Sequence, residues 1–244
     1  MRIRITFEKE GAEEFFLPLH YNHLVQGWIY KSVSKRLSRF LHDSGFIIGK
    51  RQFKLFVFSR LLGRFKILGE FIYFNGPVWL YIGSPLDRFM QDFANGLFRS
   101  GTLQLGTESL RIKEIAILDE PNFDKENYIR MLSPVTTYST LLTPDGRRKT
   151  YYYSPMEKEF RDLLNRNALK KYQLLYGRAL KGPLQVEPIR VKESIVMYKD
   201  TVVRGWTGCF KLDGPKTLIK TVYDAGLGSK NSEGFGMFEV IENC

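Results

Sequence analysis

Apolar and polar residues alternate at the start of the chain, where residues 1–7 read MRIRITF. This period of two predicts a strand with one buried face, and it places Arg2 and Arg4 on the open face. From Asn22 onward the apolar residues recur at helical spacing, with Asn22 as the expected N-cap and Gly45 as the stop. The chain therefore begins with a predicted strand followed by a helical region.

The remainder of the first half continues this mixture of strands and helices. A second helix is predicted between Pro85, which suits its opening, and Gly101, which suits its end. Strands are predicted over residues 53–59, 70–74, 77–83 and 110–118. The order strand, helix, strands, helix, strand is the ferredoxin-like plan, in which an antiparallel sheet carries both helices on one face.

The second half repeats this plan after a polar segment, residues 119–127, that we interpret as a linker. A long helix is predicted to end at Gly177, with Ser154 as its N-cap and Pro155 at its first position. A second helix is predicted over residues 215–228, and strands over residues 128–140, 190–198, 202–212 and 237–242. We therefore predict an α+β protein with two tandem ferredoxin-like, RRM-like domains, residues 1–120 and residues 121–244.

An excess of basic residues narrows the choice of partners. The 244 residues include 37 Lys and Arg against 26 Asp and Glu, which gives a net charge of +11 and a pI near 9.5. Such a chain is drawn to polyanions, so nucleic acid is the first partner to consider and an anionic membrane the second. A generally basic surface with no dedicated partner explains the charge equally well, so a second signal is required.

The cysteines and the N-terminal segment bear on the cellular setting. Cys209 and Cys244 are too few for a disulfide framework or a four-thiolate zinc site. The N-terminal segment becomes charged by Glu8, which argues against a signal peptide, and no apolar run approaches the ~18 residues of a membrane span. We expect a cytoplasmic protein that does not span a membrane.

A glycine-rich loop, AGLGSKNSEGFGMFEV, covers residues 225–240. It is not a dinucleotide fingerprint, because Asn231 stands where the third glycine is needed, and it is not a Walker loop, because Phe235 follows Gly234. Bare backbone amides in such a loop can approach a phosphate. The candidate RNA-binding residues here are Gly226, Gly228, Lys230, Asn231, Ser232, Gly234 and Gly236. A helix cap at Gly226 followed by turn glycines is the alternative interpretation.

The loop and five other segments together resemble a known family. The segments are LPLHYNHLVQGWIYKSV, FLHDSG, KLFVFS, LSPV and SPMEKEF, in the expected order along nearly the whole chain. They resemble the repeat-associated mysterious protein (RAMP) superfamily, and specifically the CRISPR-associated endoribonuclease that cuts repeat RNA into guide units. The resemblance implies two ferredoxin-like domains, RNA held across the cleft between them, and cleavage that uses no metal or other cofactor.

The resemblance also implies three catalytic residues, which match Tyr30 in GWIY, His42 in FLHD and Lys54 in KLFVFS. Cleavage by the 2′-OH needs a base, an acid for the leaving 5′-oxygen and a positive charge near the phosphate, and it leaves a 2′,3′-cyclic phosphate and a 5′-hydroxyl. Which of His42 and Tyr30 is the base stays open, and Lys50 or Arg51 could replace Lys54.

Other basic residues are candidate phosphate contacts. They form the clusters 50–51, 60–64, 147–149 and 170–171. We favour Arg51, Lys54 and Lys230, and we add Arg147, Arg148 and Lys149. His20 and His23 have a spacing that could share a metal, but no further ligand completes a set, so a structural role is expected.

The expected partner is CRISPR repeat RNA, with proteins of a CRISPR effector complex as further candidates and a monomer or homodimer as the assembly. Two rival functions remain. One is a non-catalytic RNA-binding subunit of an effector complex, and the other is a metal-dependent nuclease that uses His20 and His23.

The proposed catalytic pair makes a demand on local structure. On one straight helix Tyr30 and His42 would lie about 18 Å apart along the axis and roughly 120° apart in direction, too far to share a phosphate. We therefore predict a break within residues 32–35, with Ser34 capping a short second helix that ends by Ser44.

Overall fold

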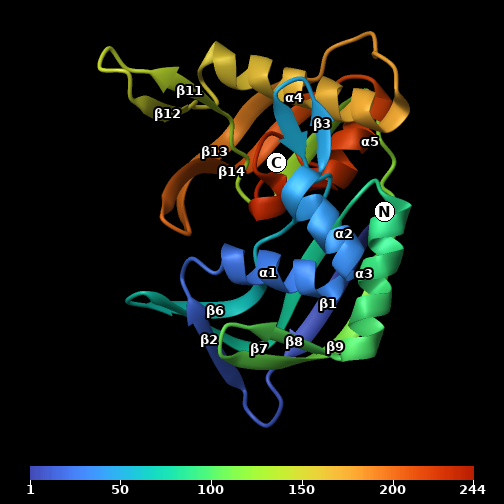
Figure 1. Cartoon of the computed structure of the whole chain (residues 1–244), viewed down its shortest axis with the longest axis vertical. Helices are drawn as coiled ribbons and strands as arrows, with labels where there is room; N and C mark the ends of the chain where they lie inside the picture. Colours follow the sequence, from blue (N-terminus) through green and yellow to red (C-terminus); the bar gives the residue numbers. More distant parts are fainter.

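Two antiparallel sheets, one from each half of the chain, form the frame of the molecule (Figure 1). The computed structural model describes every residue, 1–244. In the first sheet the strand order is β2-β7-β1-β9-β8, and β5 and β6 also pair with β7. Its strands are β1 (Arg2–Glu8), β2 (Glu14–Pro18), β5 (Val57–Phe58), β6 (Leu62–Leu68), β7 (Phe71–Gly83), β8 (Thr102–Leu105) and β9 (Glu108–Leu118).

Helices α1 (Asn22–Ser32) and α3 (Asp87–Ser100) cover one face of this sheet, and they share a single apolar core with β1 and β7. Trp28 of α1 packs edge-on against Phe93 of α3, with 5.5 Å between the ring centroids. Burial of large apolar side chains is the dominant favourable contribution to folding. The shared core therefore fixes the direction of α1 relative to the sheet.

The second sheet has the strand order β13-β14-β10-β15. Its strands are β10 (Glu126–Met131), β13 (Gln185–Tyr198), β14 (Thr201–Asp213) and β15 (Phe238–Ile241). Helices α4 (Lys158–Tyr176) and α5 (Lys216–Ala225) bury their apolar sides in a second core with these strands. Each half thus has the ferredoxin-like order, and the predicted α+β fold class is confirmed. The domain boundary at residues 120 and 121 stays a prediction.

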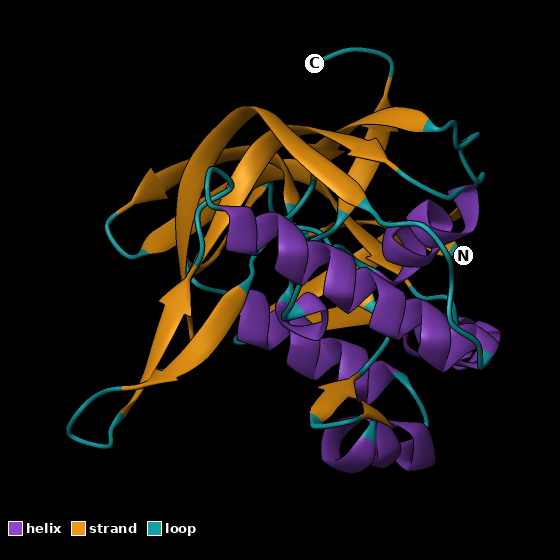
Figure 2. Ribbon diagram, turned by 90° about the horizontal axis from the view of Figure 1, so that it is seen from above, coloured by secondary structure: helices purple, strands orange, loops and turns teal.

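Two short hairpins stand outside the main sheets. One consists of β3 (Phe46–Ile48) and β4 (Arg51–Phe53), and the other of β11 (Tyr138–Leu142) and β12 (Arg148–Tyr152). The β11–β12 hairpin projects away from the rest of the chain in both ribbon views (Figures 1 and 2). The β3–β4 hairpin instead lies against α4 and so connects the two halves (Figure 1).

Several predicted strands have different bounds in the structure. The strand predicted over residues 53–59 is interrupted between β4 and β5, because Leu55 has a left-handed backbone with φ of 54°. The strands predicted over residues 70–74 and 77–83 form one strand, β7. The segment predicted over residues 128–140 divides into β10 and β11.

Two predicted helix caps are also wrong. Tyr21, not Asn22, is the N-cap of α1, and the Asn22 side chain is instead bonded to residues elsewhere in the chain, Arg60 and Glu233. Helix α4 begins at Lys158 with Glu157 as N-cap, so Ser154 and Pro155 belong to the preceding turn. The linker is shorter than predicted, because β10 already begins at Glu126.

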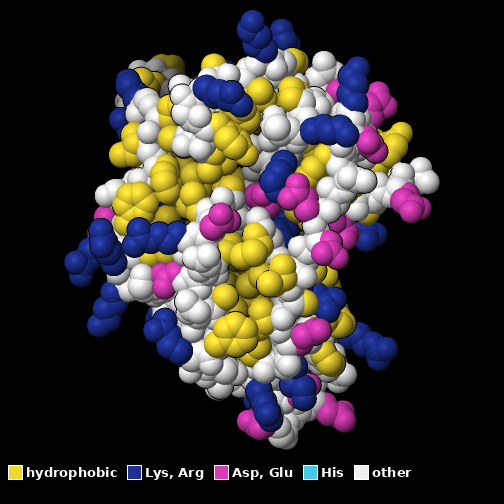
Figure 3. Space-filling view, turned by 90° about the vertical axis from the view of Figure 1, so that its right-hand side faces the viewer, with side chains coloured by type: hydrophobic (Ala, Val, Ile, Leu, Met, Phe, Trp, Pro, Cys, Tyr) yellow, Lys and Arg dark blue, Asp and Glu magenta, His cyan; other side chains and the backbone are white.

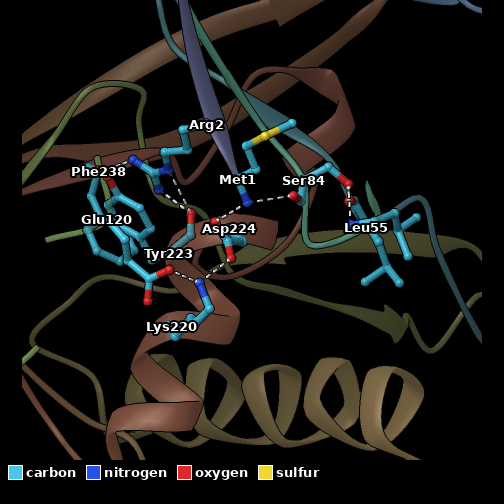
Figure 4. A network of polar contacts seen from close by, with 10 residues as sticks. Met1, Arg2, Leu55, Ser84, Glu120, Lys220, Tyr223, Asp224 and Phe238 are labelled. Carbon is cyan, nitrogen blue, oxygen red and sulfur yellow. Dashed lines mark hydrogen bonds and ion pairs between the residues drawn. The ribbon is translucent and has the colours of Figure 1, made fainter. Parts of the chain in front are cut away.

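The prediction that Arg2 lies on an open face is wrong, because its side chain is buried between the two halves (Figure 4). Its guanidinium donates hydrogen bonds to the carbonyl oxygens of Tyr223 and Phe238 and lies 3.3 Å from the centroid of the Tyr223 ring. Burial lowers the pKa of Arg2 to about 10. Nearby, the Met1 amino group pairs with Asp224 at 3.0 Å. A polar network therefore links β1 to α5.

The surface agrees with the basic composition. On the face in Figure 3, Lys and Arg side chains project around most of the outline, and apolar side chains are exposed between them. None of the helices combines the length and apolar character that crossing a membrane requires.

Candidate active site

The predicted break in the first helical region is confirmed. Helix α1 ends at Ser32, and the Ser34 hydroxyl accepts a hydrogen bond from the Leu37 amide to cap α2 (Lys35–Arg39). The backbone amide of Ser34 donates to Asp92 of α3 at 2.8 Å. A π-helical turn, η1 (Phe40–Ser44), completes the segment. The chain thus turns after α1, and His42 of η1 lies beside Tyr30 of α1.

The break brings Tyr30 and His42 together. Their rings lie edge to face, with 6.2 Å between the centroids, and Tyr30 also packs edge-on against Phe56 at 5.8 Å. Burial of the phenol, reinforced by the nearby Glu233 carboxylate, raises the pKa of Tyr30 to about 12. At neutral pH Tyr30 therefore keeps its proton and can act as a donor.

His42 is oriented by the residue that follows it. Its side chain is 75% exposed, and its Nδ1 lies 2.8 Å from Oδ1 of Asp43. An ionised carboxylate only accepts hydrogen bonds. Nδ1 therefore carries the ring hydrogen and donates a hydrogen bond to Asp43. The other nitrogen, Nε2, is then left with a free lone pair that can accept a proton.

Lys54 reaches the same place from the segment after β4. Its Nζ donates a hydrogen bond to the His42 carbonyl oxygen at 2.8 Å, and the strained residue Leu55 follows it directly. Burial lowers the pKa of Lys54, and Asp43 partly opposes this effect. Two of the three ammonium hydrogens remain free for another acceptor. Tyr30, His42 and Lys54 are therefore neighbours in the structure, although Lys54 lies outside any strand.

The glycine-rich loop and Lys54 line the same hollow, and a buried lysine of α4 holds the loop in place. Nζ of Lys171 in α4 donates to the carbonyl oxygens of Gly226 and Gly228 at 2.6 and 2.9 Å and to Oδ1 of Asn231 at 2.6 Å. Burial lowers the pKa of Lys171 to about 7. The Asn231 amide donates to the carbonyl oxygens of Leu227 and Phe235. Both donors of Asn231 are thus engaged inside the loop and not available to a phosphate.

The four loop glycines face protein rather than open space. Each has a positive φ and is buried, and an added Cβ would come within 3.0 Å of protein atoms at Gly226, Gly228, Gly234 and Gly236. At Gly236 that Cβ would lie 1.9 Å from the Leu227 carbonyl oxygen. These glycines are therefore required for the close packing of the loop. They do not form the open backbone surface that was expected to contact a phosphate.

The outer part of the loop turns towards the candidate catalytic residues. Gln26 of α1 donates to the Ser232 carbonyl oxygen at 2.6 Å, which docks η2 (Asn231–Glu233) on the helix that carries Tyr30. Lys230 pairs with Glu233 at 2.8 Å. Burial alone would lower the pKa of Lys230, but this pairing outweighs it and raises the pKa. A hollow between the two halves is lined by Lys54, Lys230, Ser232, Glu233 and Arg51, among others.

The remaining basic candidates divide into two groups. Arg51 is exposed beside this hollow, with its guanidinium 5.7 Å from the centroid of the Tyr138 ring. Arg147, Arg148 and Lys149 lie in the projecting β11–β12 hairpin, where none of them lines the hollow. Arg147 pairs there with Asp145. The structure therefore brings Arg51, but not the hairpin cluster, to the candidate site.

The other two histidines have local structural contacts. Nδ1 of His20 accepts a hydrogen bond from the Met197 amide, and Nδ1 of His23 lies 3.0 Å from the His20 carbonyl oxygen. Burial, together with the nearby Arg60, lowers the pKa of His20. No cluster of three or more His, Cys, Asp or Glu side chains has a geometry that suits a metal ion.

Sequence reasoning missed several residues of this site. Asp43 could have been found from its position next to His42. Lys171 was a candidate phosphate contact, and its role in holding the loop gave no signal because its acceptors lie more than 50 residues further along the chain. Glu233 was part of the loop motif, but its pairing with Lys230 depends on the left-handed backbone of Lys230, with φ of 60°.

Two family models match the chain in sequence. The model described as CRISPR-associated protein Cas6, N-terminal, matches residues 16–116, and the model described as CRISPR associated protein Cas6, C-terminal, matches residues 118–240. A relative from Methanocaldococcus jannaschii, named CRISPR-associated endoribonuclease Cas6 1, is 30% identical over 100% of this chain and 95% of its own length. CRISPR-associated endoribonuclease Cas6 of Pyrococcus furiosus is 28% identical over 100% of this chain and 91% of its own length.

Solved structures agree with these matches. A structure described as CRISPR associated protein Cas6 has a TM-score of 0.83 at 29% identity and covers 99% of both chains. A structure described as a RAMP protein binding different RNA substrates has a TM-score of 0.86 at 24% identity, covering 99% of this chain and 100% of the other, which supports the fold. On the two family models and the full-length relative, this chain belongs to the Cas6 family of CRISPR-associated proteins.

Proposed function

We propose that this chain is an endoribonuclease that cuts CRISPR repeat RNA into guide RNAs. The relatives that it matches along its whole length are named CRISPR-associated endoribonucleases. The observation that carries the proposal is the meeting of Tyr30, His42 and Lys54, with 6.2 Å between the two rings and 2.8 Å from the lysine Nζ to the His42 carbonyl oxygen. These groups supply a proton acceptor, a proton donor and a positive charge.

The proposed reaction is attack by the 2′-OH on the adjacent phosphate, without a metal ion. Nε2 of His42 takes the proton of the 2′-OH, because Asp43 holds the proton of the ring on Nδ1. The oxygen that loses this proton bonds to phosphorus, and the bond to the 5′-oxygen breaks. The products are a 2′,3′-cyclic phosphate and a 5′-hydroxyl.

Tyr30 and Lys54 act on the other atoms of the phosphate. Because Tyr30 keeps its proton at neutral pH, we assign it as the donor to the leaving 5′-oxygen. The free hydrogens of the Lys54 ammonium stabilise the charge that develops on the non-bridging oxygens. In this assignment the base and the acid come from the two sides of the helix break.

The experiment is cleavage of an RNA that carries the CRISPR repeat of the same genome, in excess EDTA. We expect cutting to continue, to leave a 2′,3′-cyclic phosphate, and to stop when the nucleotide 5′ of the scissile phosphate lacks its 2′-OH. Loss of cutting in EDTA, with recovery on addition of a divalent ion, would contradict the proposed chemistry and favour a metal-dependent nuclease.

A pair of histidine variants tests the site itself. We expect His42→Ala to lower the cleavage rate by about 10²–10⁴-fold while retaining RNA binding, because a proton-transfer group contributes mainly to the transition state. His23→Ala is the matched control and should cut at the wild-type rate. The rival non-catalytic subunit predicts instead that the wild-type protein binds the repeat RNA and leaves it intact.

A further inference from the structure

A second basic hollow lies beside the candidate active site, between α4 and the β3–β4 hairpin. Arg166 and Lys170 line it from α4, Arg51 lines it from the hairpin, and Asn167, Ser229 and Tyr138 complete the polar part of the lining. We call this group the α4 hollow. Arg166 and Lys170 are four residues apart, so both side chains project from the same side of the helix.

The cations of the α4 hollow have no acidic partner. Arg51, Arg166 and Lys170 form no ion pair in the structure, and no carboxylate lines the hollow. In contrast, Lys230 is paired with Glu233 and Arg147 with Asp145. Cations brought together without a counter-charge repel one another, so an anionic ligand that lies between them relieves an unfavourable interaction.

An unsatisfied polar group lies in the same lining. Oδ1 of Asn167 is buried without a hydrogen-bond partner. Buried side-chain amides are nearly always hydrogen-bonded in folded proteins. A ligand that brings a hydrogen-bond donor of its own would satisfy this oxygen.

The α4 hollow is continuous with the candidate active site. Arg51, Tyr138, Asn167 and Ser229 line both hollows, and Lys54 lies in the wall of the first. A chain of phosphates that enters at Lys54 therefore meets Arg51 next and then the face of α4. Successive phosphates of one strand suit this row, whereas a single small anion would use one end of it.

We propose that the α4 hollow binds backbone phosphates of the RNA strand on one side of the scissile bond, through Arg51, Arg166 and Lys170. This inference rests on the proposed function and adds a path for the RNA over α4. Oδ1 of Asn167 then accepts a hydrogen bond from a ribose 2′-OH, and the Ser229 hydroxyl donates to a phosphate oxygen. Arg166 and Lys170 contribute to binding rather than to the chemical step, because neither lines the hollow that contains Lys54.

The test compares two double variants of α4. Arg166→Gln with Lys170→Gln removes two charges from the α4 hollow, and Lys158→Gln with Arg161→Gln removes two exposed charges from another side of the same helix. We expect the first pair to weaken binding of repeat RNA by about tenfold. The slope of the logarithm of the binding constant against the logarithm of the salt concentration should become shallower by about 0.7 for each phosphate that the variant no longer binds. The second pair should bind as wild type does.

Shortened RNAs provide the second measurement. Removal of the nucleotides on one side of the cut should weaken wild-type binding more than it weakens binding by the Arg166→Gln, Lys170→Gln variant, since this variant keeps only Arg51 of the three cations. Equal affinities and equal salt slopes for the two double variants would overturn the proposal even if the wild type cuts the RNA. If the wild type does not cut the RNA but the two double variants still differ in affinity, the result would support RNA binding by the α4 hollow and contradict the proposed function.

Discussion

Lys171 is a lysine whose ammonium group lies wholly inside the protein. Its side chain is 1% exposed and donates to two carbonyl oxygens and one amide oxygen of the glycine-rich loop. An ammonium has three hydrogens, so all three acceptors are satisfied only while Lys171 is charged. The residue connects α4 to the loop that lines the candidate active site, and we expect it to position that loop.

Replacement of Lys171 should loosen the loop. Lys171→Met keeps most of the side-chain volume but leaves three buried acceptors without donors, so we expect a loss of about 1–3 kcal/mol in the free energy of unfolding. Urea denaturation measures this loss, with the exposed Lys158→Met of the same helix as the control. Equal stability of the two variants would contradict the positioning role.

The stability difference should also depend on pH. Burial lowers the pKa of Lys171 from 10.5 to about 7, so between these values the unfolded chain binds more protons than the native protein. The free energy of unfolding therefore gains a contribution that rises with pH from about 7 upward, and Lys171→Met lacks it. Denaturation at pH 7, 8 and 9 should show the wild type gaining stability relative to the variant. If the stability of the wild type relative to Lys171→Met decreases over this range, the pKa of Lys171 is not lowered by folding and the prediction is wrong.

Two glycines with similar backbone conformations allow the cost of backbone strain to be distinguished from the cost of overpacking. Gly236 and Gly146 have φ of 81° and 78°, but an added Cβ would lie 1.9 Å from the Leu227 carbonyl oxygen at Gly236 and would meet no atom within 4 Å at Gly146. We expect Gly146→Ala to cost about 1 kcal/mol through backbone strain and Gly236→Ala about 2–5 kcal/mol through strain and overpacking. Similar losses in thermal or chemical denaturation would refute the packing role of Gly236.

At the scale of the elements, the helix break decides whether a site exists. The sequence was sufficient to predict it, because Tyr30 and His42 cannot meet on one helix and Ser34 is a suitable cap. The β3–β4 hairpin was not predicted, because its two strands are only three residues long and have little buried surface to impose a period. The left-handed Leu55 was not predictable either, since its conformation depends on tertiary contacts such as that of its carbonyl oxygen with Ser84.

The position of the break is held by close contact between α1 and α3. At Gly96 of α3 an added Cβ would lie 1.7 Å from the Ser32 carbonyl oxygen, at the end of α1. We expect Gly96→Ala to lower both stability and the rate of RNA cleavage, because α1 must move and Tyr30 with it.

Gly27 of α1 provides the opposite case for the same substitution. An added Cβ there meets nothing within 4 Å, so Gly27→Ala should stabilise the helix by about 0.5–1 kcal/mol. In a denaturation experiment Gly27→Ala should raise the free energy of unfolding, and Gly96→Ala should lower it. A stabilising effect of Gly96→Ala would mean that α1 and α3 separate without consequence, contrary to the proposed constraint.

At the scale of the whole molecule, the candidate site depends on both halves. Tyr30, His42 and Lys54 come from the first half, whereas Lys230 and Glu233 come from the last elements of the second. The paired ferredoxin-like plan followed from the order of strands and helices in the sequence. The way in which the halves meet did not, because Arg2 reads as an exposed residue of an alternating strand and its acceptors lie more than 200 residues away.

Arg2 and Arg4 offer a matched test of this junction. Both lie on β1, but Arg2 is buried against carbonyl oxygens of Tyr223 and Phe238, whereas Arg4 forms a partly exposed ion pair with Glu114. Arg2→Met should lower the free energy of unfolding by about 2–4 kcal/mol, because buried acceptors lose their donor. Arg4→Met should cost about 1 kcal/mol or less, as exposed pairs do. Because the halves are then held less firmly, we expect calorimetry of Arg2→Met to show two separable transitions where the wild type shows one. A single transition with unchanged stability would mean that Arg2 does not couple the two halves.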